Sequence, residues 1–217
     1  ALEANTTGSG HVAIGYNALD AITTSDNSVA IGYEALTAHT APQPSVAVGR
    51  GALKSNVTGQ YNVAVGDRAL MDNTANFNTA VGGFALYENT TATHNVAMGY
   101  AAMEKNTTGA YNTAVGAAAL DANTTAGNNT AMGYNSLTAN TTGSSNTSVG
   151  SLSMQVNTGG SNLTGVGVRS LDNNSTGNNN TALGVQALRY NTTGSQNVAI
   201  GLGALVSNTT ASNNTAV

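Results

Sequence analysis

Hydrophobic and polar residues return along the chain in a pattern with a period of 17 residues. The glycine that ends each motif of the Ala-Val-Gly type defines repeat position 0. These glycines are Gly15, Gly32, Gly49, Gly66, Gly82, Gly99, Gly116, Gly133, Gly150, Gly167, Gly184 and Gly201. Every step is 17 residues except one of 16, between Gly66 and Gly82. We therefore expect a single repeat array over residues 1–217, cut in mid-repeat at both ends.

The consensus of the repeat is N-T/V-A-V/I-G-x-x-A-L-x-x-N-T-T-G-x-x. Its period fits neither heptads nor helical-pair repeats. Val, Ile and Thr favour strands, Asn-Thr-Thr-Gly favours a turn, and the recurring Gly and β-branched residues disfavour helix. The pattern predicts an all-β protein, a parallel β-solenoid of about 13 coils. In the 16-residue unit, the missing residue falls between Asn73 and Asn78, which we place in a turn because a deletion within a strand would turn its side chains over.

Repeat positions −1 and +4 are apolar in every unit, position +4 being Leu or Met, and we expect both to fill the inside of each coil. Position −2 is Ala except at Ser148 and Gly165, and successive strand residues point to opposite faces. We therefore expect the alanines to face a partner chain. Fifteen of the sixteen charged residues lie at positions +1, +2, +5 or +6, which predicts that this side faces water.

Composition narrows the classes of function. Charged residues make up 7% of the chain, against about 25% in typical globular domains. The net charge is −4 and Lys and Arg form no cluster, so we expect no nucleic-acid partner. No apolar run is long enough to span a bilayer, so we expect no membrane insertion. His11, His39 and His94 lack metal-ligand spacing and carboxylates are not paired, which predicts a non-enzymatic protein without metal or cofactor.

Several motifs carry a family resemblance. "HVAIGYNAL", "NVAVGDRAL", "NTAVGAAAL" and "NVAIGLGAL" resemble the head repeats of trimeric autotransporter adhesins. The longer unit "GYNSLTANTTGSSNTSVG" resembles repeats of bacteriophage tail fibres, and it exceeds the usual adhesin-head unit in length. The resemblance implies a left-handed parallel β-roll, a homotrimer, and a location outside the cell on a cell surface or virion. It also implies a structural or adhesive role, with a cell-surface glycan or receptor as a further partner.

Two columns of asparagine accompany the apolar pattern. Position +7 includes Asn106, Asn123 and Asn140, and position −4 includes Asn112, Asn129 and Asn146. Stacked amides can hydrogen-bond from coil to coil, which favours a structural ladder. The alternative is N-glycosylation, since many of these sites have the sequence Asn-x-Ser/Thr.

Tyrosines recur on the charged side, at position +1, where they are candidates for contact with a sugar or receptor: Tyr16, Tyr33, Tyr100 and Tyr134. The simpler interpretation is that their rings cover neighbouring coils. Threonines at positions +8 and +9 raise the alternative of an ice-binding surface. The leading hypothesis is thus a fibre segment that assembles as a homotrimer, and its alternative is a monomeric ice-binding or glycan-binding β-solenoid.

Overall fold

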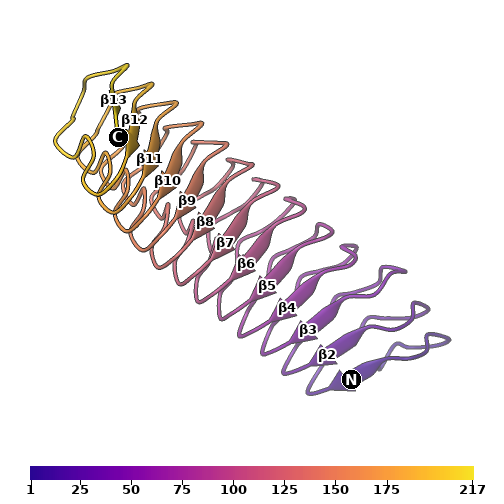
Figure 1. The fold of residues 1–217 in the computed structure, drawn as a ribbon. Coiled ribbons are helices and arrows are strands. Elements are labelled where there is room, and N and C mark those ends of the chain that lie inside the picture. Colours follow the sequence, from indigo (N-terminus) through magenta and orange to yellow (C-terminus); the bar gives the residue numbers. More distant parts are fainter. The chain divides into compact units, whose positions relative to one another are not determined.

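A computed structural model describes all residues, 1–217, and contains strands and turns but no helix. The chain forms two compact units, Ala1–Ala110 and Tyr111–Val217. Each unit is a parallel β-solenoid in which every coil contributes one short strand (Figure 1). The first unit contains β1 (Val12–Ile14), β2 (Val29–Ile31), β3 (Val46–Val48), β4 (Val63–Val65), β5 (Thr79–Val81) and β6 (Val96–Met98). The second contains β7 (Thr113–Val115), β8 (Thr130–Met132), β9 (Thr147–Val149), β10 (Thr164–Val166), β11 (Thr181–Leu183), β12 (Val198–Ile200) and β13 (Thr215–Ala216).

Neighbouring strands pair in parallel and join residues at the same repeat position. Ala13 lies opposite Ala30, and Ala131 opposite Ser148. The 16-residue coil keeps this register, because Val63 in β4 still pairs with Thr79 in β5. The predicted β-solenoid with its 17-residue period is thereby confirmed within each unit.

The missing residue of the short coil lies in the turn, as predicted. Asn73 donates from Nδ2 to the carbonyl of Ala75, two residues further on, at 2.8 Å. In the following coil, Asn89 makes the equivalent bond to Ala92, three residues further on, at 3.0 Å. The side chain therefore closes a turn that is shorter by one residue, and the strands are undisturbed.

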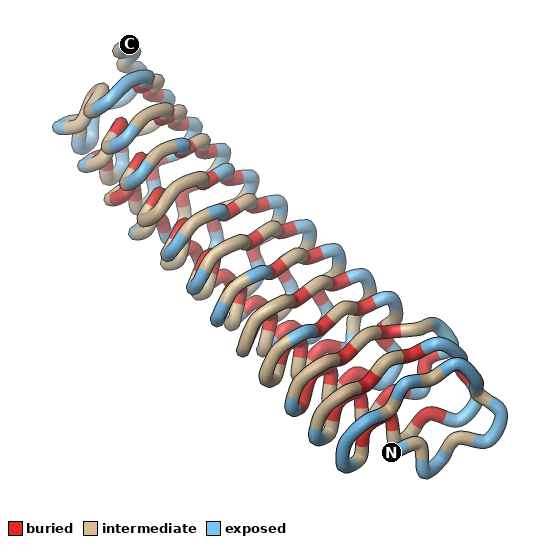
Figure 2. The backbone as a smooth tube through the Cα atoms, turned by 60° about the horizontal axis from the view of Figure 1, so that its bottom comes forward, coloured by how far each residue is buried: buried red, intermediate tan, exposed pale blue.

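The strands are oriented in the opposite sense to the sequence-based expectation. The alanine at position −2 is inside, and Ala64 has an exposed fraction of 0%. The large apolar residue at position −1 is outside, with 37% exposure at Val65 and 60% at Ile14. Figure 2 shows this alternation as a buried middle residue in strand after strand. The predictions that position −1 fills the core and that position −2 faces a partner are both wrong.

The narrow interior of the coil explains this orientation. A Cβ placed on Gly165, at position −2, would lie 2.8 Å from Cε of Met154 at position +4 of the coil before. It would also lie 3.1 Å from Oγ of Ser153 at position +3. The strand thus packs directly on the Ala-Leu pair, which leaves room for Ala and not for Val or Ile. Met154 extends into the space that the missing methyl group of Gly165 leaves.

The other exception to alanine at position −2 is held by hydrogen bonds. Ser136 donates from its hydroxyl to Oγ of Ser148 at 2.8 Å, and Ser148 donates in turn to the carbonyl of Ser153 at 3.0 Å. All three serines are buried with 0% exposure. A buried hydroxyl is tolerated when it is hydrogen-bonded, so serine at position −2 is matched by serine at the facing position +3.

The turn after each strand relies on left-handed backbone. The glycine at position 0 has a φ between 119° and 143°, and a Cβ on Gly133 would lie 2.6 Å from the carbonyl oxygen of Gly150. Position +4 is buried as predicted in every coil between the terminal residues Leu2 and Leu205, which are partly exposed, and in all coils its Leu or Met also has a positive φ, between 49° and 58°. Such a conformation costs a non-glycine residue about 1–2 kcal/mol. The burial of a large apolar side chain, worth roughly 1.5–3 kcal/mol, offsets this cost.

Candidate interaction surface

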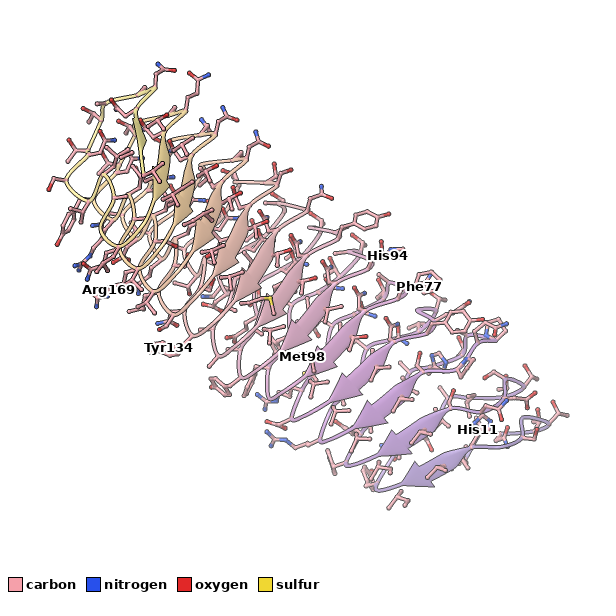
Figure 3. All side chains as sticks on the ribbon, viewed as in Figure 1. His11, Phe77, His94, Met98, Tyr134 and Arg169 are labelled. Carbon is pink, nitrogen blue, oxygen red and sulfur yellow. The ribbon has the colours of Figure 1, made fainter.

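The strands of each unit present their outward side chains as a continuous uncharged surface, which we call the strand face. It consists of the residues at positions −3 and −1, which are the first and third residues of β1 to β12. Several of the aliphatic residues are more than a third exposed: Val12, Ile14, Val65, Met98, Met132, Val166 and Ile200. Met98 lies on this face in Figure 3. Because the alanines fill the interior, no inward position remains for these larger side chains.

The two units differ in the composition of the strand face. In the first unit, position −3 is Val in every strand except β5, where it is Thr79. In the second unit, position −3 is Thr in every strand except β12, where it is Val198. Position −1 is Val, Ile, Leu or Met in both units. The first unit therefore carries two aliphatic columns, and the second carries one aliphatic column beside one of threonine.

The candidate tyrosines are exposed, and only two of them stack on each other. Tyr16 and Tyr33 lie on adjacent coils with their ring centroids 5.4 Å apart, and they are 64% and 51% exposed. Tyr100 packs edge-on against Phe84, with a centroid distance of 5.9 Å. Tyr134 lies in the second unit and is exposed (Figure 3). Within the first unit, Tyr100 is thus not part of the Tyr16–Tyr33 stack, and the contacts of these three tyrosines agree with rings that cover neighbouring coils.

A second aromatic column was missed from the sequence. Tyr61, Phe77 and His94 all occupy position −5, and their exposed rings stack in order along the first unit. The centroids of Tyr61 and Phe77 lie 5.5 Å apart, and those of Phe77 and His94 lie 5.0 Å apart. Figure 3 shows Phe77 and His94 side by side at one edge of the coils. Their spacings of 16 and 17 residues match the repeat and could have revealed the column.

The asparagines at position +7 are buried and bond to one another. Asn140 donates from Nδ2 to Oδ1 of Asn123 at 3.1 Å and to the carbonyl of Gly143 at 2.8 Å. Asn106 makes the same pair of bonds, to Asn89 at 3.0 Å and Gly109 at 2.9 Å. The exposed fractions of Asn106, Asn123 and Asn140 are all 0%. In the folded chain these amides point inward, away from any enzyme that would attach a glycan.

The asparagines at position −4 link the coils through the backbone. Oδ1 of Asn112 accepts a bond from the backbone NH of Asn129 at 2.9 Å, and Oδ1 of Asn129 accepts from that of Asn146 at 3.0 Å. Each Nδ2 donates to a carbonyl in the next coil, as Asn146 does to Gly160 at 2.9 Å. The half of the coil opposite the Ala-Leu pair is therefore an interior filled with hydrogen-bonded amide side chains, and around His39 two buried atoms, Nε2 of His39 and Oδ1 of Asn56, lack a partner.

The threonines at position +8 also bond from coil to coil. The hydroxyl of Thr141 donates to the carbonyl of Thr158 at 3.1 Å, and that of Thr192 donates to the carbonyl of Thr209 at 3.0 Å. These hydroxyl protons are already engaged with the backbone. The arrangement gives no specific support to an ice-binding surface at positions +8 and +9.

The charged side carries ion pairs between neighbouring coils. Arg50 contacts Asp67 through two bonds, Nε to Oδ1 at 2.8 Å and Nη2 to Oδ2 at 3.0 Å. The Arg50 hydrogen bonds hold the pKa of the Asp67 carboxyl below its usual value. Lys54 lies 2.6 Å from Glu34 through Nζ and Oε2. Because Arg50 and Asp67 are exposed, their pairing contributes little to stability.

The structure offers no cluster of three His, Asp or Glu side chains that could hold a metal ion. It also contains no helix with the length and apolar character that crossing a bilayer requires. Neither a protein-family model nor a curated protein sequence matches the chain. The surfaces described above are therefore the features of the molecule that bear on its function.

Proposed function

We propose that the chain is a non-enzymatic structural segment of an extracellular fibre or surface adhesin, and that its copies associate as a homotrimer through the strand face. The observation that carries the proposal is the outward orientation of the aliphatic column at position −1, with 44% exposure at Met98 and 43% at Met132. Soluble monomers rarely expose contiguous apolar patches larger than a few hundred Å². A column that continues over every strand of a unit favours a permanent partner.

The chemistry of the strand face favours a second copy of the chain as that partner. None of its positions is charged, so it offers no complementarity to a charged protein, a nucleic acid or an anionic membrane. Its side chains recur once per coil, and a partner must present apolar groups at the same interval to contact them along the whole unit. Another copy meets this condition, and closed cyclic symmetry would cover the face on every chain.

The motif resemblance supports the finer features of the proposal. The Asn-Thr-Ala-Val-Gly motifs are similar to those of trimeric adhesin heads and phage tail fibres, which favours three copies and a left-handed coil. The hydrogen-bonded amide columns make each unit a stiff element, which suits a shaft or attachment head. Tyr16 and Tyr33 follow the glycine turn and are not part of the strand face, and their exposed rings are candidates for contact with a glycan or receptor.

Sedimentation equilibrium of the isolated chain tests the proposal. The chain mass is 21.6 kDa, and the expected species has three times this mass. The double variant Val48→Lys, Val65→Lys places charges on the strand face and is expected to sediment as a folded monomer. Ala117→Lys, on the exposed charged side, serves as the matched control and keeps the assembly.

A folded wild-type monomer would overturn the assembly proposal. The alternative of a monomeric ice-binding or glycan-binding solenoid would then be examined by thermal hysteresis and by a glycan array.

A further inference from the structure

A cavity of about 160 Å³ opens on the charged side of the first unit, around Gly51. We call it the Gly51 cavity. Its lining includes Tyr33, Glu34, Arg50, Lys54 and Arg68, which come from three successive coils. It is smaller than the roughly 300–1,000 Å³ pockets that enclose drug-sized ligands. It therefore suits one group of a larger ligand that lies along the surface.

The cavity exists because one side chain is missing from a column. Position +2 is Glu34 in the coil before, Gly51 in the middle and Arg68 in the coil after. Gly51 has a φ of 65°, and the nearest atom to a Cβ placed on it is Cγ of Arg68, at 3.7 Å. A side chain at this position would meet no backbone and would fill the space between Glu34 and Arg68.

Positive charge is concentrated around this gap. Three of the six Lys and Arg residues of an acidic chain line the cavity, namely Arg50, Lys54 and Arg68. Arg50 and Lys54 each have a carboxylate partner. The guanidinium of Arg68 instead lies 5.6 Å from the ring centroid of Phe84 and has no ion-pair partner. Its donors remain available to an anion that enters the cavity.

We propose that the Gly51 cavity binds the carboxylate group of an acidic sugar. The fork of Arg68 matches a planar carboxylate, and the ammonium of Lys54, which is paired with Glu34, lines the same cavity. Glu34 offers an acceptor for sugar hydroxyl groups, and its negative charge disfavours ligands with several carboxylates close together. Tyr33 lines the cavity, is half exposed and stacks on Tyr16, so its ring offers an exposed apolar contact for a sugar. This site is separate from the strand face and does not depend on self-association.

The test is an NMR titration with methyl glucuronide. Methyl glucoside, which lacks the carboxylate, and glutarate, which lacks the sugar ring, are the control probes. We expect millimolar binding of the glucuronide that weakens as salt is raised, and markedly weaker binding of the other two probes. Gly51→Gln fills the cavity, and the repeat already accepts glutamine at position +2, where Gln186 has a φ of 61°. This variant is expected to lose the binding. Gly203→Gln is the matched control, since Gly203 shares the repeat position and has no atom near its Cβ.

Arg68→Ala supplies a second variant that does not depend on filling the cavity. Ala101 and Ala118 occupy the same repeat position, so alanine is compatible with the fold. Loss of a charge-assisted contact is expected to weaken binding about tenfold or more. Arg169→Ala, which removes the same charge from the same repeat position in the second unit, should leave binding unchanged. The proposal is overturned by the absence of glucuronide binding, by equal binding of the glucoside or glutarate, or by equal losses in the variants and their controls.

Discussion

Asn140 donates a hydrogen bond from Nδ2 to Oδ1 of Asn123, 3.1 Å away in the preceding coil. Both side chains are fully buried, and the same amide also closes the turn at Gly143. One side chain thus joins two coils and fixes the shape of its own turn. This relationship explains why the repeat keeps asparagine at position +7 in most coils.

Replacement of Asn140 by alanine is expected to destabilise the second unit. It removes the bond that Asn140 donates to Oδ1 of Asn123 and the acceptor that it offers to Nδ2 of Asn157, while the Gly143 carbonyl keeps its bond from Asn129. The loss of these buried bonds is expected to cost about 1–3 kcal/mol. The urea midpoint, followed by circular dichroism, should fall accordingly. Thr141→Ala removes an exposed hydroxyl that also bonds to the next coil, and it should cost less than about 1 kcal/mol. Equal effects of the two substitutions would contradict a buried ladder.

The inward orientation of position −2 predicts energetic coupling between Gly165 and Met154. A methyl group on Gly165 meets Cε of Met154, so Gly165→Ala should be better tolerated when Met154→Leu shortens that side chain. A double-mutant cycle in urea is expected to give a favourable coupling energy of about 0.5 kcal/mol or more. Val166→Ala, on the outward side of the same strand, should be additive with Met154→Leu. If the effects of Gly165→Ala and Met154→Leu were additive, position −2 would not face the core as described.

His39 predicts a stability that depends on pH. It occupies position +7 in place of asparagine, is fully buried, and lies 3.2 Å from Nδ2 of Asn56 through Nδ1, while Nε2 has no partner. Burial lowers the pKa of His39 below its usual value of 6.5. The unfolded chain therefore binds a proton more readily than the folded chain as the pH falls below about 6.5. The free energy of unfolding therefore decreases as the pH falls from that value to the folded-state pKa of His39.

His39→Asn restores the ladder residue and should remove this loss of stability. Thermal unfolding of the wild type and the variant is compared at about pH 7.5 and about pH 5, which lie above and below the usual pKa of an imidazole. We expect the two proteins to diverge at the lower pH, with the variant the more stable. His94→Asn, at an exposed position, is the control and should not change the pH dependence. If the unfolding temperatures of the wild type and of His39→Asn fell equally at the lower pH, the pH dependence would come from groups other than His39.

The sequence predicted the solenoid because its period and turn chemistry leave few alternatives. It also placed the Leu of position +4 inside and located the short coil's missing residue between Asn73 and Asn78. The strand orientation was not predictable from hydrophobicity, because a Val-Ala-Val strand has an apolar residue on either face. The deciding factor is the space beside the Ala-Leu pair, which is visible at Gly165 and Met154 only in three dimensions.

The sequence predicted the candidate features that follow from the repeat, but not those that arise from an exception to it. Asparagine columns follow from the repeat alone, because residues at one repeat position must stack. The contacts of Tyr16 and Tyr33 follow from the same rule. The Gly51 cavity depends on the absence of one side chain between Glu34 and Arg68, and the sequence pattern gives such an exception no special weight. The left-handed backbone of the buried leucines is likewise invisible in a propensity pattern.

The most direct measurement of the central claim is thiol cross-linking, because the chain contains no cysteine and a single substitution is a unique probe. Val65→Cys places a thiol on the strand face, and Gly83→Cys places one on the charged side, where a Cβ has ordinary contact distances. Under mild oxidation at low protein concentration, we predict covalent dimers for Val65→Cys and none for Gly83→Cys. Cross-linking of Gly83→Cys alone, or of neither variant, would contradict association through the strand face.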